Sequence, residues 1–286
     1  MLRLKGPSKY KREFLLVYGH HSSLERLHGL AELLAQYGNV TMPDIPGFGG
    51  MDPFYKIGLE PNVDTFADYL AAFIKLRYKR RKVVLVGFSY SVPVMVRMLQ
   101  KYPDVVKQAE FMISISGFVH HEDFQLPPLY RNSLKIGALI FSRKIPSYFM
   151  KYVLLNPLII RMTYNLMSNR HWKIKDADEK ERKARIDYEQ VLWKINDPRT
   201  WITTTGEMFM LDLCSDRVEL PLHHVVPPID VYFNHNVVEQ HMRVIFSEVT
   251  SYETNMPNHA PSVLATVEDM RPMFPEEVAR MLRGDK

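Results

Sequence analysis

The chain has 286 residues, 46% of them hydrophobic, which is enough to bury the core of one large domain with an insertion. The apolar segments are too short for the roughly 18–20 residues of a membrane-spanning helix, and the single cysteine, Cys214, excludes an intrachain disulfide and a cysteine metal cluster. The net charge of +5 is concentrated in residues 125–175, which hold nine Lys or Arg and no Asp or Glu, but no nucleic-acid-binding motif accompanies it.

The N-terminal half of the chain alternates between predicted strands and helices. Its first 14 residues lack the apolar stretch of a signal peptide, so a cytoplasmic location is expected. Short apolar runs predict strands, and longer stretches with apolar residues at helical spacing predict helices. In chain order these are strand 14–19, helix 23–37 with Ser23 as its cap, strand 39–42, helix 64–78, strand 83–86, helix 91–102 and strand 109–116.

This alternation stops near Gly117 and resumes late in the chain. Residues 120–199 are predicted to be mainly helical, without a strand rhythm. A strand at 229–233, a helix at about 239–248, a strand at 249–253 and a last helix around 263–283 follow. The pattern predicts an α/β protein with a mostly parallel central sheet flanked by helices. Its core would comprise 1–119 and 200–286, interrupted by a helical cap at 120–199.

A serine lies at the point where one predicted strand gives way to a helix. The sequence GFSYS, Gly87 to Ser91, must turn within very few residues, which forces strained backbone angles on Ser89 and requires small residues two positions away. Gly87 meets this requirement and Ser91 is small enough. The pattern resembles the G-x-S-x-G nucleophile elbow of the α/β-hydrolase superfamily, in a G-x-S-x-S form. The alternative is an ordinary strand-to-helix turn with no catalytic role.

The resemblance extends to the other parts of such a site. A nucleophilic serine needs a base, and His259 lies in the sequence NHAP, on the loop where the superfamily carries its histidine. The superfamily has a His-Gly pair after the first central strand, where this chain has Tyr18-Gly19. The resemblance therefore implies that the amides of His20 and Tyr90 form the oxyanion hole. His21 and Phe88 are expected to contact the substrate, and the side chains of the two histidines either line the pocket mouth or face solvent.

The third member of the triad departs from the pattern. The superfamily places an aspartate a few residues after the strand assigned here to 229–233, and Asn236 occupies that position. An asparagine can orient the imidazole but carries no charge to stabilise the imidazolium. Asp123 matches an acid position used by some relatives, and Glu239 lies one helical turn beyond Asn236. A two-residue system with water in place of the acid is the remaining interpretation.

The cap segment mixes large apolar residues with scattered Lys and Arg. Three interpretations remain open: the apolar residues are buried while basic stems cover their edges, the cap lines an acyl-sized pocket, or a basic amphipathic surface binds anionic lipid. Residues 175–185 alternate in charge and predict a solvated helix.

Two functions follow from these observations. The first is a serine hydrolase of a carboxylic ester, with an apolar or lipid-like group, that needs no cofactor and no metal. The second is a non-catalytic relative that binds a ligand or partner through the same pocket. A small-molecule ester and an anionic membrane surface are the expected partners, and nucleic acid is not.

Overall fold

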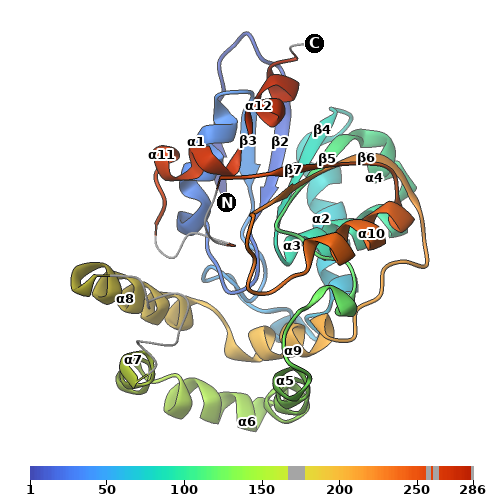
Figure 1. Ribbon diagram of the computed structural model, residues 1–286. Helices are drawn as coiled ribbons and strands as arrows, with labels where there is room; N and C mark the ends of the chain where they lie inside the picture. The colour runs from blue at the N-terminus through green and yellow to red at the C-terminus, as the bar shows by residue number, and fades with distance from the viewer. Residues whose placement is uncertain (167–177, 256–258, 260–263, 285–286) are drawn as a thin grey trace.

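A seven-stranded sheet forms the centre of the protein. The computed structural model describes residues 1–166, 178–255, 259 and 264–284 (Figure 1). Every neighbouring pair of strands is parallel except β1 with β3. The predicted mostly parallel α/β sheet is confirmed. Across the sheet the strands are β1 (Leu2–Leu4), β3 (Asn39–Met42), β2 (Glu13–Val17), β4 (Val83–Phe88), β5 (Ala109–Ile115), β6 (Val218–Val226) and β7 (Phe246–Glu253).

Helices surround this sheet. Those of the core are α1 (His28–Ala35), α2 (Val63–Tyr78), α3 (Ser91–Lys101), α4 (Pro103–Gln108), α10 (His235–Ile245), α11 (Val267–Met270) and α12 (Glu276–Arg283). Short 3-10 segments are η1 (Glu25–Leu27), η2 (Phe54–Ile57), η3 (His121–Asp123) and η5 (Arg271–Met273). The helix α1 packs against α11, and α2 packs against α3 and α4 (Figure 1).

Between β5 and β6 the chain leaves the sheet and forms a helical layer. Its elements are α5 (Pro128–Phe141), α6 (Lys144–Phe149), the π-helical turn η4 (Met150–Leu154), α7 (Pro157–Leu166), α8 (Glu179–Ile195) and α9 (Pro198–Met208). In Figure 1 these helices lie below the sheet, with α9 nearer to it than α5 and α6. The solvated helix predicted at 175–185 corresponds to the start of α8, although 175–177 lie outside the described residues.

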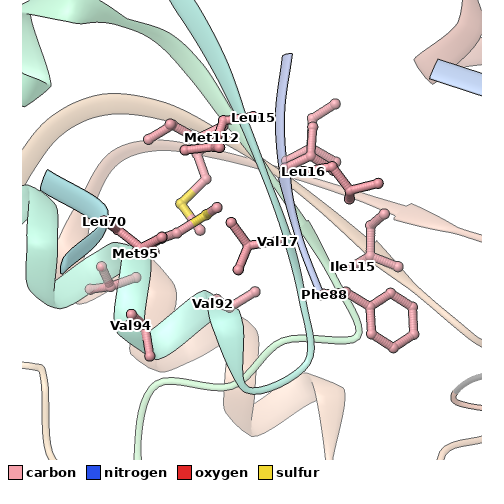
Figure 2. Packing of buried hydrophobic residues seen from close by; sticks show 14 of the residues in the cluster. Leu15, Leu16, Val17, Leu70, Phe88, Val92, Val94, Met95, Met112 and Ile115 are labelled. Atoms are coloured by element: carbon pink, nitrogen blue, oxygen red, sulfur yellow. The ribbon is translucent and has the colours of Figure 1, made fainter. Parts of the chain in front are cut away.

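The buried core supports the turn after β4. Figure 2 shows Val92 and Met95 of α3 pointing toward Val17 of β2 and Met112 of β5. All four side chains are at most 1% exposed. Close packing of this kind holds the turn between β4 and α3 in one conformation, because interiors leave little room for side chains to shift.

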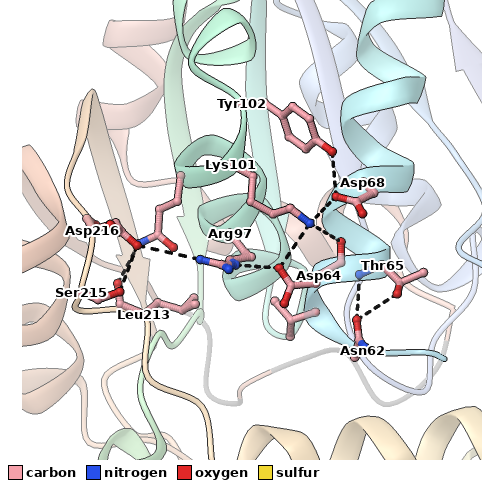
Figure 3. Close-up of polar contacts among 12 residues, drawn as sticks. Asn62, Asp64, Thr65, Asp68, Arg97, Lys101, Tyr102, Leu213, Ser215 and Asp216 are labelled. Atoms are coloured by element: carbon pink, nitrogen blue, oxygen red, sulfur yellow. Dashed lines mark hydrogen bonds and ion pairs between the residues drawn. The ribbon is translucent and has the colours of Figure 1, made fainter.

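Charged side chains join α2 to α3 at the surface. Figure 3 shows Arg97 donating to Asp64 over 2.8 Å and Lys101 contacting Asp68 at 2.5 Å. Tyr102 also donates to Asp68, over 2.8 Å. Exposed pairs of this type contribute at most about 1 kcal/mol each. They therefore fix how the two helices meet more than they stabilise the fold.

The predicted strand at 229–233 is wrong. The sixth strand is β6, which ends at Val226 because Pro227 and Pro228 follow it and cannot donate ladder hydrogen bonds. Pro221 lies inside β6, where the pairing register with β7 shifts. A proline is tolerated at such an irregularity. Residues 229–233 instead form a loop that precedes α10.

Three further expectations differ from the structure. The first predicted helix begins as η1 at Glu25 without a side-chain cap, so Ser23 does not cap it. The last predicted helix is divided into α11 and α12 because Pro272 and Pro275 interrupt it. The N-terminal edge strand β1 was not predicted from the sequence.

Candidate active site

Ser89 occupies a strained turn between β4 and α3. Its φ of +52° lies in the left-handed region, which a serine rarely adopts. Two backbone hydrogen bonds hold it there: its amide donates to the carbonyl of Ile115 over 2.9 Å, and its carbonyl accepts from Val92 over 3.0 Å. The turn places the serine at the carboxyl end of a central parallel strand, where α/β sheets bind ligands.

The residues two positions from Ser89 fit the turn in different ways. A Cβ on Gly87 would come within 3.1 Å of both Met95 Sδ and Val92 Cγ2, so this position has little room for a side chain. Ser91 has a side chain, and its hydroxyl accepts a 2.7 Å hydrogen bond from the Phe88 amide. That hydroxyl also lies 2.8 Å from the Val17 carbonyl, to which it can donate. The serine that replaces the usual glycine therefore ties the turn to β2.

The structure brings His259 next to Ser89, although the two residues are 170 positions apart in the sequence. His259 Nε2 lies 3.0 Å from Ser89 Oγ, within hydrogen-bonding distance. The imidazole is only 7% exposed, so water has little access to it. A base at this distance can remove the hydroxyl proton as the oxygen attacks a carbonyl.

The carboxylate beside this imidazole is Asp230, not Asn236. Asp230 Oδ2 lies 2.7 Å from His259 Nδ1 and 2.9 Å from His235 Nε2. Its Oδ1 accepts from the Tyr232 amide over 2.8 Å. Burial acts to raise the pKa of Asp230, but the hydrogen bonds from His235 and His259 outweigh it and hold that pKa well below its usual value. The carboxylate is therefore charged and fixed in orientation.

The three residues expected at the acid position lie elsewhere. Asn236 is exposed in the first turn of α10. Asp123 is fully buried, but its carboxylate contacts His241 Nδ1 at 2.6 Å and accepts from the Val119 amide over 2.8 Å. Glu239 pairs with Arg243 at the surface. The wrong assignment of the sixth strand explains the error, since it put Asp230 inside a strand rather than after one.

A second layer of histidines lies behind the carboxylate. The rings of His235 and His224 are 5.6 Å apart, and His224 Nδ1 is 3.0 Å from Ser114 Oγ. Burial, followed by the neighbouring His235, lowers the pKa of His224 to about 3, so this ring is neutral. Asp230 is thus surrounded by protein groups on the side away from His259.

The amides predicted to bind an oxyanion belong to His20 and Tyr90. Tyr90 follows Ser89 directly in the chain. Gly19, which precedes His20, approaches Ser89 so closely that a Cβ there would be 3.0 Å from Ser89 Cβ. Neither amide has a hydrogen-bond acceptor among the described residues. Both are therefore available to a substrate oxygen, and Tyr90 stands at the N-terminus of α3, whose dipole favours negative charge.

The side chains of His20 and His21 both line the pocket. His20 Nε2 lies 2.8 Å from Thr204 Oγ1 of α9, and burial, followed by the neighbouring His21, lowers its pKa to about 3. This imidazole is neutral and joins the loop after β2 to the helical layer. The ring of His21 lies against Trp193 of α8, with their centroids 4.0 Å apart.

The pocket above Ser89 has a volume of about 400 Å³, within the usual range for small-molecule sites. Ser89, His259 and Phe88 form part of its wall on the core side. The helical layer supplies much of the remaining wall, mostly with aromatic and aliphatic side chains. These include Leu126, Tyr130, Leu134, Tyr164, Trp193, Trp201, Met208 and Phe209.

One cluster outside the pocket has the donor atoms for a metal ion. Ligand atoms of His120, Glu122 and His241 lie within 4.8 Å of one another, and Asp123 contacts His241 from behind. Imidazole and carboxylate groups are ligands that divalent transition metals accept. None of the three lines the pocket, so the cluster is separate from Ser89.

Comparison with solved structures identifies the fold. A thermophilic esterase from Thermogutta terrifontis matches with a TM-score of 0.62 and 15% identity over 99% of this chain and 91% of the esterase. A hydrolase from Oleispira antarctica matches with a TM-score of 0.68 and 13% identity, over 98% of this chain and 93% of the hydrolase. A bromoperoxidase from Bacillus anthracis matches with a TM-score of 0.63 and 14% identity, over 98% of this chain and 94% of the bromoperoxidase. The chain therefore has the α/β-hydrolase fold.

The sequence alone matches no protein-family model and no curated protein. The structural matches carry names of different activities, and a fold by itself does not set an activity.

Proposed function

We propose that the protein is a serine hydrolase that cleaves a carboxylic ester with an apolar acyl or lipid-like group. The observation that carries the proposal is the hydrogen-bonded series Ser89, His259 and Asp230 beside a largely apolar pocket. Nucleophile, base and orienting carboxylate in that order are the three parts of a serine triad that carries out acyl transfer.

The proposed reaction proceeds through an acyl-enzyme. Ser89 Oγ attacks the ester carbonyl carbon while His259 Nε2 takes the hydroxyl proton, and the carbonyl oxygen becomes negative beside the His20 and Tyr90 amides. His259 then gives its proton to the departing alcohol, and the ester C–O bond breaks. Water attacks the acyl-enzyme in the same way and releases the acid and Ser89. Asp230 remains charged throughout and stabilises the imidazolium. The proposal uses no cofactor and no metal.

The pocket supports the apolar part of the substrate. Its aromatic and aliphatic lining favours a hydrocarbon chain over a charged group, because unpaired charges are costly to remove from water. The similarity to an esterase is consistent with ester cleavage, although it is shared with proteins of other names. In this proposal the segment 120–199 acts as a cap, and its helices determine which acyl chains fit.

The alternative, a non-catalytic ligand-binding relative, was favoured by the absence of an acid. Asp230 supplies a carboxylate at that position, so the alternative loses its main support.

The location proposed from the sequence is cytoplasmic, with peripheral contact to a membrane. Among the described residues, the helices are too short or too polar to traverse a bilayer.

A series of p-nitrophenyl esters of increasing acyl length tests the proposal. The wild-type protein is expected to hydrolyse them with an optimum at medium or long chains, and Ser89→Ala is expected to lose the activity. Ser133→Ala is a matched control, because Ser133 is an exposed serine on α5 that does not line the pocket. Equal rates across all chain lengths would contradict the apolar acyl site, and equal rates for wild type and Ser89→Ala would contradict the nucleophile.

A further inference from the structure

The outer face of the helical layer is strongly apolar. Leu129, Leu139, Ile145, Leu158 and Leu166 are each at least 71% exposed, and nine other large apolar side chains between 130 and 162 are at least 41% exposed. More than half of the exposed large apolar residues in the described chain lie in this short stretch. Large exposed apolar surfaces on soluble proteins commonly mark an interaction site, so this concentration of exposed apolar side chains in one segment needs an explanation. We call the exposed residues of 129–166 the outer cap surface.

The same face is basic and lacks acidic residues. Residues 125–166 include six Lys or Arg and no Asp or Glu. Arg161 pairs with Asp187 of α8 at 3.0 Å. Lys135, Arg143, Lys144 and Lys151 contact no carboxylate within the part of the chain that the structure describes.

We propose that the outer cap surface binds an anionic lipid bilayer. Exposed leucines, isoleucines and aromatic rings would enter the boundary between headgroups and acyl chains, while the cations contact lipid phosphates and carboxylates. A second copy of the chain fits this surface poorly, because it would bring the same unpaired cations face to face. The helices that carry this surface are too short to span a bilayer, so the surface would lie on the bilayer and not cross it.

The pocket and the outer cap surface share a residue, Tyr130. Tyr130 of α5 lines the pocket and is also 54% exposed, and it is adjacent to Leu129, which is 84% exposed. Leu134 of α5 and Tyr164 of α7 also line the pocket, and both helices contribute residues to the outer cap surface. A lipid ester could pass from the bilayer beside Tyr130 into the pocket. This part of the inference depends on the proposed function, whereas membrane binding does not.

Vesicle co-sedimentation of the Ser89→Ala variant tests binding without turnover. We expect it to sediment with phosphatidylcholine vesicles that contain phosphatidylserine and to bind pure phosphatidylcholine at least about tenfold more weakly, with less binding at high salt. Arg143→Glu with Lys144→Glu is expected to weaken binding by about tenfold or more. Lys9→Glu with Lys11→Glu, at exposed positions outside the cap, is the matched charge control and is expected to leave binding unchanged.

An apolar pair of variants separates insertion from charge attraction. Leu139→Asp is expected to reduce binding, whereas Leu76→Asp, at an 80% exposed position on α2, is expected to have no effect. Absence of sedimentation with any vesicle would overturn the proposal. So would a dimer in analytical ultracentrifugation that Leu139→Asp dissociates, because a second copy would then cover the surface. Equal binding by the cap and control variants would overturn it as well.

Activity measurements separate this inference from the proposed function. In the protein with Ser89 intact, Arg143→Glu with Lys144→Glu is expected to lower hydrolysis of an ester embedded in anionic vesicles about tenfold or more, and to leave hydrolysis of a water-soluble ester unchanged. Loss of both activities would contradict entry from the bilayer. If the wild type hydrolyses neither ester yet sediments with anionic vesicles, the proposed function fails and membrane binding stands.

Discussion

Replacing Asp230 with asparagine changes one atom of the site and is expected to disable it. Asp230 Oδ1 accepts a hydrogen bond from the Tyr232 amide, so the asparagine keeps its oxygen there and turns its NH₂ toward His259. That NH₂ can only donate, so His259 Nδ1 must become an acceptor and Nε2 must carry the proton. The imidazole then faces Ser89 as a donor and cannot take its proton. The same substitution in a protease triad lowers kcat roughly 10⁴-fold, or about 5 kcal/mol of transition-state stabilisation.

Steady-state hydrolysis of a p-nitrophenyl ester measures this effect, with thermal unfolding as a check that the variant folds. We expect Asp230→Asn to lose about three to four powers of ten in kcat, with KM nearly unchanged. Asn236→Ala is the matched control at the exposed position first expected to hold the acid, and it should keep nearly full activity. If Asp230→Asn stays within about tenfold of wild type while Asp123→Asn abolishes turnover, the assignment of the carboxylate is refuted.

Other predictions concern the turn and one buried acid. Gly19→Ala puts a Cβ 2.9 Å from the Phe88 carbonyl, so we expect at least about a tenfold loss in kcat/KM, and full activity would contradict the close approach. Ser91→Ala leaves the Phe88 amide without its acceptor and should cost about 1–3 kcal/mol in denaturant unfolding, where no change would contradict that bond. Burial raises the pKa of Glu207 from 4.5 to about 7, so the folded protein keeps this proton to a higher pH than the unfolded chain does. The free energy of unfolding of the wild type should therefore fall by up to about 3 kcal/mol as the pH rises from 4.5 to 7. Urea unfolding of Glu207→Gln, measured across the same pH range, should not show this fall. The same pH dependence in the variant as in the wild type would contradict the prediction.

The local sequence predicted much of the sheet because its parallel strands are short apolar runs. The strands β2 to β5 follow that pattern, since both faces of the sheet are covered. The strand β6 does not: its sequence VELPLHHVV contains a proline and two histidines, and one of these, His224, is buried by tertiary packing against Ser114. Packing therefore overrode local propensity at this strand.

The site was predictable where it depends on local turns and not where it depends on the course of a loop. Ser89 stands out because a strand, a small-residue turn and a helix adjoin it in sequence. Asp230 lies 29 residues from its histidine, and nothing in its own surroundings marks it as a partner. The signal that could have found it is the pair Pro227-Pro228, which ends a strand and makes Asp230 the first carboxylate after it.

The proposed chemistry depends on Ser89 acting as a nucleophile that His259 activates. Reaction with a fluorophosphonate, followed by mass spectrometry of the digested protein, tests it most directly. We expect one covalent adduct on the peptide that contains Ser89. It should be absent in Ser89→Ala and should form much more slowly in His259→Ala. Failure of the folded wild type to react at any pH, or an adduct that persists in Ser89→Ala, would contradict it.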